Sequence, residues 1–75
     1  MKYTNKHTDR FKKTWYKIYT NPLYYGMDSV KRWAYTNGSN GRFFFKISAM
    51  TVNWTIYEVY FENEQDATLF ALKWK

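Results

Sequence analysis

The chain has 75 residues, no cysteine and a formal net charge of +6, and aromatic residues make up 24% of it. These values exclude a disordered basic tail, which would lack aromatic residues for a core, and a disulfide-stabilised scaffold, which needs cysteines. No apolar run reaches the roughly 18 residues of a membrane span, and residues 1–6 lead into charge, unlike a signal peptide. We therefore expect a single small cytoplasmic domain covering residues 1–75.

The first half of the chain predicts a strand followed by a helix. Residues 14–20 are rich in β-branched and aromatic side chains and stop at Asn21-Pro22, as strands do. A helix over residues 8–20 is the alternative, because four apolar side chains between positions 11 and 19 would share one helical face. Asp28 or Ser29 can then cap a short helix, which Gly38 would end in a left-handed conformation.

The second half predicts a hairpin and a terminal helix. Residues 42–49 and 54–61 alternate as strands do, and residues 51–53 are short enough to join them as an antiparallel hairpin. Asn63 is predicted to be the N-cap of a helix over residues 64–74, in which its side chain accepts a hydrogen bond from the backbone N–H of Asp66. The helix carries an apolar stripe, which is expected to pack on the face of the sheet that its alternation makes apolar. The stripe is Ala67, Phe70, Ala71 and Trp74, widened by Leu69 and Leu72, and its expected contacts are Tyr57, Val59, Phe61, Phe43, Phe45 and Ile47.

These elements indicate an α+β fold. The expected architecture is a small antiparallel sheet of about three strands packed against two helices, in the βαββα order of a ferredoxin-like arrangement.

Charge is unevenly distributed along the chain. Residues 1–46 hold ten basic and two acidic side chains, a balance of +8, whereas residues 47–75 hold two basic and four acidic ones, a balance of −2. The asymmetry predicts one electropositive surface rather than a uniform positive shell.

Basic residues alternate with aromatic rings in the electropositive part of the chain. Cations release counterions condensed on phosphates, and flat rings stack on unpaired bases. We therefore predict a site for single-stranded nucleic acid on the open face of the sheet; an acidic host or viral protein is the alternative partner. Alternatively, the N-terminal segment or a second subunit covers this face, since the sequence is also compatible with self-association. The predicted binding residues are Lys12, Lys13, Trp15, Lys17, Arg42, Phe44, Lys46, Trp54 and Tyr60.

The sequence offers little for catalysis. His7 is its one histidine, no cysteine can act as a nucleophile or soft ligand, and the glycines of residues 37–41 lack the spacing of a phosphate-binding loop. Glu64 and Asp66 lie in the first turn of the predicted last helix, where a negative charge is favourable beside the positive end of the helix dipole. Their presence therefore does not indicate a catalytic site. We therefore expect a non-catalytic protein without a metal or a cofactor.

Two resemblances add to this interpretation. The segment Gly41-Arg42-Phe43-Phe44-Phe45-Lys46-Ile47 resembles the aromatic strand motif of RNA-recognition domains, and residues 59–67 resemble the strand-to-helix junction of those domains. Residues 60–74 resemble the ends of small uncharacterised proteins of tailed bacteriophages. The second resemblance implies a virus-encoded accessory protein of the host cytoplasm, either a host-enzyme inhibitor or a virion component, that binds a host or viral partner.

Overall fold

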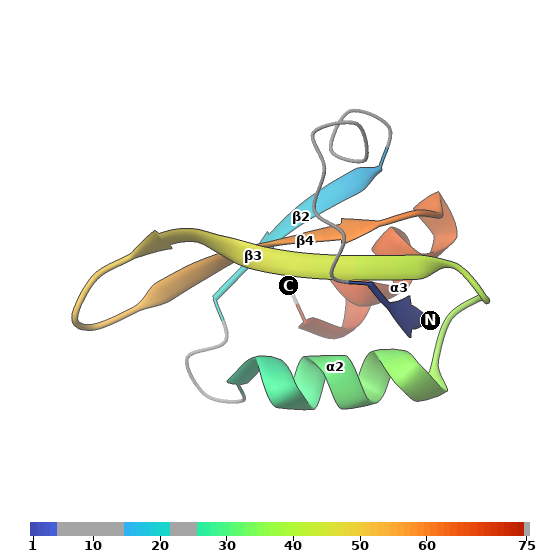
Figure 1. Ribbon diagram of the computed structural model, residues 1–75, viewed down its shortest axis with the longest axis horizontal. Helices are drawn as coiled ribbons and strands as arrows, with labels where there is room; N and C mark the ends of the chain where they lie inside the picture. Colours follow the sequence, from blue (N-terminus) through green and yellow to red (C-terminus); the bar gives the residue numbers. More distant parts are fainter. Residues whose placement is uncertain (5–14, 22–25, 75) are drawn as a thin grey trace.

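The computed structural model of the chain describes residues 1–4, 15–21 and 26–74. The elements along the chain are β1 (Lys2–Tyr3), β2 (Tyr16–Thr20), α2 (Gly26–Thr36), β3 (Arg42–Met50), β4 (Thr55–Phe61) and α3 (Glu64–Trp74) (Figure 1). The fold is of the α+β class, as predicted. Residues 16–20 form the predicted strand, while residues 8–14 lie outside the described part of the chain. No helix within the described ranges is long and apolar enough to cross a membrane.

The sheet has the strand order β1-β3-β4-β2. β3 and β4 form the predicted antiparallel hairpin, β2 pairs antiparallel with β4, and β1 pairs parallel with β3. The expectation of about three antiparallel strands is therefore corrected to a mixed sheet with a fourth strand. β1 escaped the sequence analysis because Lys2 and Tyr3 are too few to show a period-two pattern.

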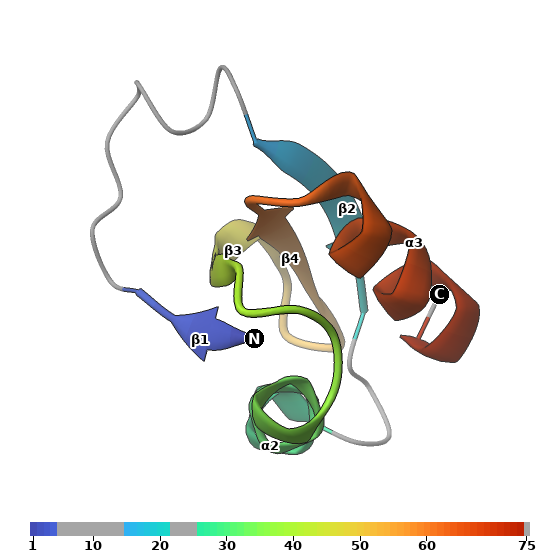
Figure 2. The same cartoon turned by 90° about the vertical axis from the view of Figure 1, so that its right-hand side faces the viewer.

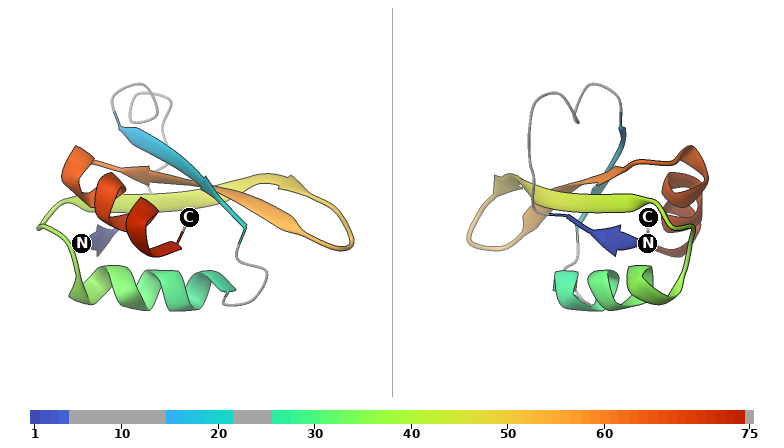
Figure 3. Two further views of the ribbon diagram at one scale, coloured as in Figure 1. Left: turned by 180° about the vertical axis from the view of Figure 1, so that it is seen from behind. Right: turned by 45° about the vertical axis from the view of Figure 1, so that its right-hand side comes forward.

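Both helices lie on one side of the sheet, and the other side carries no described helix (Figures 2 and 3). Hydrophobic burial between helices and sheet forms the core, which is the main favourable term for a domain of this size. The fully or largely buried residues of this core are Met1, Met27, Val30, Ala34, Phe43, Val59, Phe61, Ala67 and Phe70.

Helix α2 begins earlier than predicted. It starts at Gly26, so Asp28 lies within the first turn instead of capping it, where its charge still faces the positive end of the helix dipole. The predicted end is confirmed: the helix stops at Thr36, and Gly38 has a φ of 80°.

A buried carboxylate of α3 joins this helix to the loop between α2 and β3. Asp66, only 1% exposed, accepts hydrogen bonds from the backbone nitrogen of Ser39 at 2.8 Å and from its hydroxyl at 2.7 Å. The Asn63 side-chain amide donates to the same hydroxyl at 2.8 Å. The predicted side-chain cap is therefore wrong in detail, because the Asp66 N–H donates to the backbone oxygen of Asn63 at 3.1 Å. Asn63 ties α3 to the loop before β3.

The apolar stripe of α3 is narrower than predicted. Phe70 is fully buried and Trp74 packs against the core, but Leu72 is 81% exposed and Leu69 also faces solvent. Ile47, an expected contact of the stripe, is half exposed. The reason is geometric: β3 and β4 run on past the helices as a hairpin, so the outer part of this strand face has no helix over it (Figures 1 and 3).

Candidate binding surface

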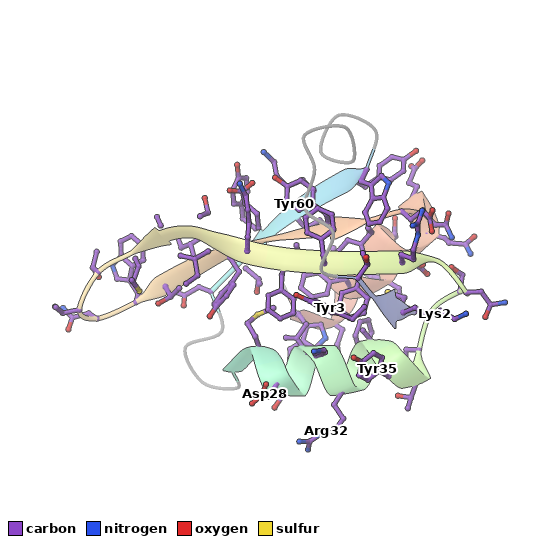
Figure 4. The ribbon with its side chains drawn as sticks, in the orientation of Figure 1. Lys2, Tyr3, Asp28, Arg32, Tyr35 and Tyr60 are labelled. Atoms are coloured by element: carbon purple, nitrogen blue, oxygen red, sulfur yellow. The ribbon has the colours of Figure 1, made fainter. Side chains whose placement is uncertain are left out.

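The side of the sheet away from the helices, which we call the open sheet face, brings together most of the predicted binding residues. Strand register places Lys17 and Phe44 on either side of Tyr60. One step along, Tyr19 and Lys46 flank Glu58 in the same way. Figure 4 shows Tyr60 on the side of the sheet opposite α2, whereas Tyr3 lies on the same side as α2.

Two of the predicted stacking rings are buried. Phe44 has no exposed surface and Tyr60 is 3% exposed. Their rings stack on each other with centroids 4.7 Å apart, and the Trp15 ring lies 5.4 Å from Phe44. This corrects the prediction of an exposed platform, because a ring without accessible surface cannot stack on a base. Phe44 and Tyr60 act as the packed floor of the open sheet face.

The accessible rings of this face lie at its margins, each beside a cation. Tyr19 is half exposed, and the Lys17 ammonium lies 5.1 Å from the centre of its ring. The Arg42 guanidinium lies 5.3 Å from the centre of the half-buried Trp15 ring. Such cation–π pairs place a flat surface and a positive charge within reach of the same ligand.

Carboxylates moderate the charge of the face. Glu62 accepts from the Arg42 guanidinium at 2.7 Å and from its backbone nitrogen at 3.0 Å, while Glu58 lies 3.9 Å from the Lys17 ammonium. The hydrogen bonds from Arg42 lower the pKa of Glu62 and raise the pKa of Arg42 in return. An anionic ligand must compete with these two carboxylates for the cations.

Glu58 and Tyr60 form a hydrogen-bonded pair across the floor of the face. The Tyr60 hydroxyl donates to the Glu58 carboxylate, which lowers the pKa of Glu58. Burial and the same hydrogen bond raise the pKa of Tyr60 well above its ordinary value of 10.0. The pair fixes the tyrosine ring against Phe44 and orients the carboxylate toward Lys17.

Among the predicted residues, Trp54 does not join this face, and two others are not tested. Lys12 and Lys13 lie outside the described residues. Trp54 lies in the turn between β3 and β4, where it lines a hollow of about 300 Å³ together with Met27 of α2. β4 begins at Thr55, so the strand alternation that placed Trp54 on the same face as Tyr60 does not extend to it.

A second group of basic and aromatic residues lies on α2 and β1, and the sequence analysis missed it. The Lys31 ammonium lies 4.2 Å from the centre of the Tyr3 ring, and Tyr35 is 54% exposed. Arg32 points away from the sheet (Figure 4). The i, i+4 spacing of Lys31 and Tyr35 on a helix was a signal for this group, although the partner from β1 could not be foreseen.

Comparison with known proteins gives no relative: no protein-family model, curated protein or solved structure matches this chain significantly. Among the described residues, no group of three or more His, Cys, Asp or Glu side chains is placed to hold a metal ion.

Proposed function

We propose that this protein is a non-catalytic binder of single-stranded nucleic acid and that it uses the open sheet face. One observation carries the proposal: Trp15, Lys17, Tyr19, Arg42 and Lys46 gather on the same side of the sheet, with two cations placed over two accessible rings. Cations that contact phosphates and rings that stack on bases are the two components of such sites.

The burial of Phe44 changes how the ligand would be held. Bases would stack on Tyr19 and Trp15 at the margins, while the backbone would follow Lys17, Lys46 and Arg42 between them. Each stacked base contributes about 1–3 kcal/mol by truncation, so two rings are enough for weak binding supported by charge.

A matched pair of tyrosine variants tests the proposal. Tyr19→Ala removes a half-exposed ring of the open sheet face, and Tyr35→Ala removes a ring of similar exposure on α2. In a titration of a fluorescein-labelled single strand followed by anisotropy, Tyr19→Ala is expected to weaken binding about fivefold or more. Tyr35→Ala should leave the affinity within about twofold, since surface substitutions away from the site have little effect. Equal effects of the two variants would refute the assignment of the site.

Salt dependence separates this proposal from stacking alone. Three phosphate contacts predict a slope of about −2 in a plot of log affinity against log salt concentration for a single strand. Raising salt from about 50 to about 200 mM would then weaken binding about 20-fold. Replacing Lys17 with Gln should reduce the slope by about 0.7, and an unchanged slope would show that this lysine contacts no phosphate.

A second candidate is an acidic protein bound by the same face. The burial of Phe44 and Tyr60 favours it, because a carboxylate-rich surface needs the cations of the face but no stacking ring. This candidate predicts negligible affinity for oligonucleotides at physiological salt and a salt-sensitive complex with an acidic protein instead.

Two further proposals concern the fold and the origin of the chain. The order β2-α2-β3-β4-α3, with β4 between β2 and β3, supports a ferredoxin-like arrangement to which β1 is an addition. The resemblance of residues 60–74 to tailed-phage proteins supports a phage-encoded accessory protein that works in the host cytoplasm. A host-enzyme inhibitor or a virion component would use the face in the same way.

A further inference from the structure

The two carboxylates of the open sheet face differ in how much of their hydrogen-bonding capacity is already used. Glu62 accepts three hydrogen bonds from Arg42, which occupy both of its oxygens. Glu58 accepts from the Tyr60 hydroxyl through Oε1, and its other hydrogen-bond partner is the Ser48 side chain. Because an ionised carboxylate offers about four acceptor sites, Glu58 keeps capacity for a ligand.

Neighbours in the sheet hold Glu58 in place. Strand register puts it opposite Tyr19 of β2 and opposite Lys46 of β3. Its side chain is 13% exposed, and the Lys17 ammonium lies 3.9 Å from its Oε1 atom. The hydrogen bond from Tyr60 is the main cause of the lowered pKa of Glu58, so the group is ionised at neutral pH and only accepts hydrogen bonds. A ligand on the open sheet face therefore meets a fixed, anionic acceptor.

The exposed ring nearest to this acceptor is Tyr19. Directly opposite residues of an antiparallel pair have Cβ atoms about 4.5–5.5 Å apart, which is less than the width of a purine. Burial and the bond to Glu58 raise the pKa of Tyr60 most, and the Tyr19 phenol adds to them, which places that phenol near the hydrogen-bonded pair. A base stacked on the half-exposed Tyr19 ring would thus present an edge to the Glu58 carboxylate.

The chemistry of that edge distinguishes the bases. The Watson–Crick edge of guanine carries two adjacent donors, N1–H and N2–H, which match the two oxygens of a carboxylate. Cytosine and adenine offer one amino group there, and thymine or uracil offers one N–H between two carbonyls that an anion repels. We therefore propose that Glu58 selects guanine for the base stacked on Tyr19. This inference rests on the proposed function of the open sheet face.

Two octanucleotides that differ in one chemical group test the selection. One alternates thymidine with deoxyguanosine, and the other alternates thymidine with deoxyinosine, which lacks only the N2 amino group. The two purines have the same ring system, so a difference in affinity reports the edge of the base and not its stacking. In anisotropy titrations at one low salt concentration, the unmodified chain is expected to bind the guanine octamer about fivefold or more tightly than the inosine octamer.

A matched pair of glutamate variants assigns the selection to one residue. Glu58→Gln keeps the size of the side chain and an acceptor for the Tyr60 hydroxyl, but it replaces one acceptor oxygen with a donor. Its preference for guanine should fall below about twofold, while its affinity for the inosine octamer stays within about threefold of the original or rises, because a negative charge is removed. Glu62→Gln is the control and should keep the preference, since Glu62 is occupied by Arg42.

The possible failures are distinguishable. Equal affinities of the unmodified chain for the two octamers would overturn the selection and leave the proposed function standing. Loss of the preference in Glu62→Gln as well would show that net charge sets it, and an equal loss of affinity for both octamers in Glu58→Gln would show that Glu58 is only structural. Binding of neither octamer by the unmodified chain would overturn the proposed function together with the selection.

Discussion

Replacing Gly38 with alanine tests the junction between the α2–β3 loop and α3. Gly38 has a φ of 80°, and a Cβ added there would lie 2.7 Å from Met1 Cε and 2.8 Å from Asp66 Oδ1. The Met1 side chain is buried in the core, and its Cγ also lies 2.9 Å from the added Cβ. The Asp66 carboxylate is held in place as well, because it is buried and accepts two hydrogen bonds from Ser39.

Gly26 supplies a control with the same backbone conformation but no neighbour. Its φ is 68°, and an added Cβ would meet nothing within 4 Å. Gly26→Ala should therefore show only the strain of a left-handed residue, about 1–2 kcal/mol. Gly38→Ala adds the disturbance of a hydrogen-bonded buried carboxylate, about 1–3 kcal/mol more. The entropy that alanine removes from the unfolded chain is common to both variants and cancels in the comparison.

Urea unfolding followed by tryptophan fluorescence measures both free energies of unfolding. An unchanged slope with urea would confirm that the variants differ in stability and not in the extent of unfolding. The double variant Gly38→Ala/Asp66→Ala should lose less stability than the sum of its single changes, because the shorter side chain removes the overlap. Equal losses for Gly38→Ala and Gly26→Ala would refute the close contact between Gly38 and Asp66.

Three further predictions use the same unfolding measurement. Phe44→Ala should reduce the free energy of unfolding by about 3–5 kcal/mol, since the ring is fully buried, whereas Leu72→Ala should change it by less than about 0.5 kcal/mol; similar losses would contradict the burial of Phe44. The lowered pKa of Glu58 predicts a stabilising contribution that is complete above its ordinary pKa of 4.5 and is lost as pH falls through the lower folded-state value. In a plot of the free energy of unfolding against pH, Glu58→Gln should therefore flatten the decline at acid pH. The raised pKa of Tyr60 predicts a stabilising contribution that is complete below pH 10.0 and is lost as pH rises toward the folded-state value. Tyr60→Phe should remove this loss of stability at alkaline pH. The same loss in the variant would contradict the prediction.

Sequence patterns predicted the long helices and strands because the residues of each carry the hydrophobic periodicity of that secondary structure. Alternation gave β3 and β4 nearly to their ends, and the apolar spacing around Phe70 gave α3. β1 lacked such a signal, because a two-residue strand is defined by its partner and not by its own pattern. The start of α2 was misplaced because a good capping residue, Asp28, also serves inside a first turn.

The membership of the candidate site was predicted in part, with Tyr19 missed and Trp54 wrongly included, whereas the exposure of its rings was not predictable. Alternation correctly placed Phe44, Lys46 and Tyr60 on one face of the sheet. It could not show that Phe44 and Tyr60 are covered, since burial depends on neighbours that are distant in sequence, such as Trp15. It also could not show that Ile47 is half exposed, because a strand pattern carries no information about where its covering helix ends.

Mapping the contact surface by NMR tests the central proposal most directly. A single-stranded oligonucleotide is added to the isotope-labelled chain at low salt, and chemical-shift changes are followed residue by residue. The proposal predicts the largest changes at Trp15, Lys17, Tyr19 and Arg42, which reverse when salt is raised. Changes concentrated around Lys31 on α2 or in the turn between β3 and β4, or none at all, would contradict binding through the open sheet face.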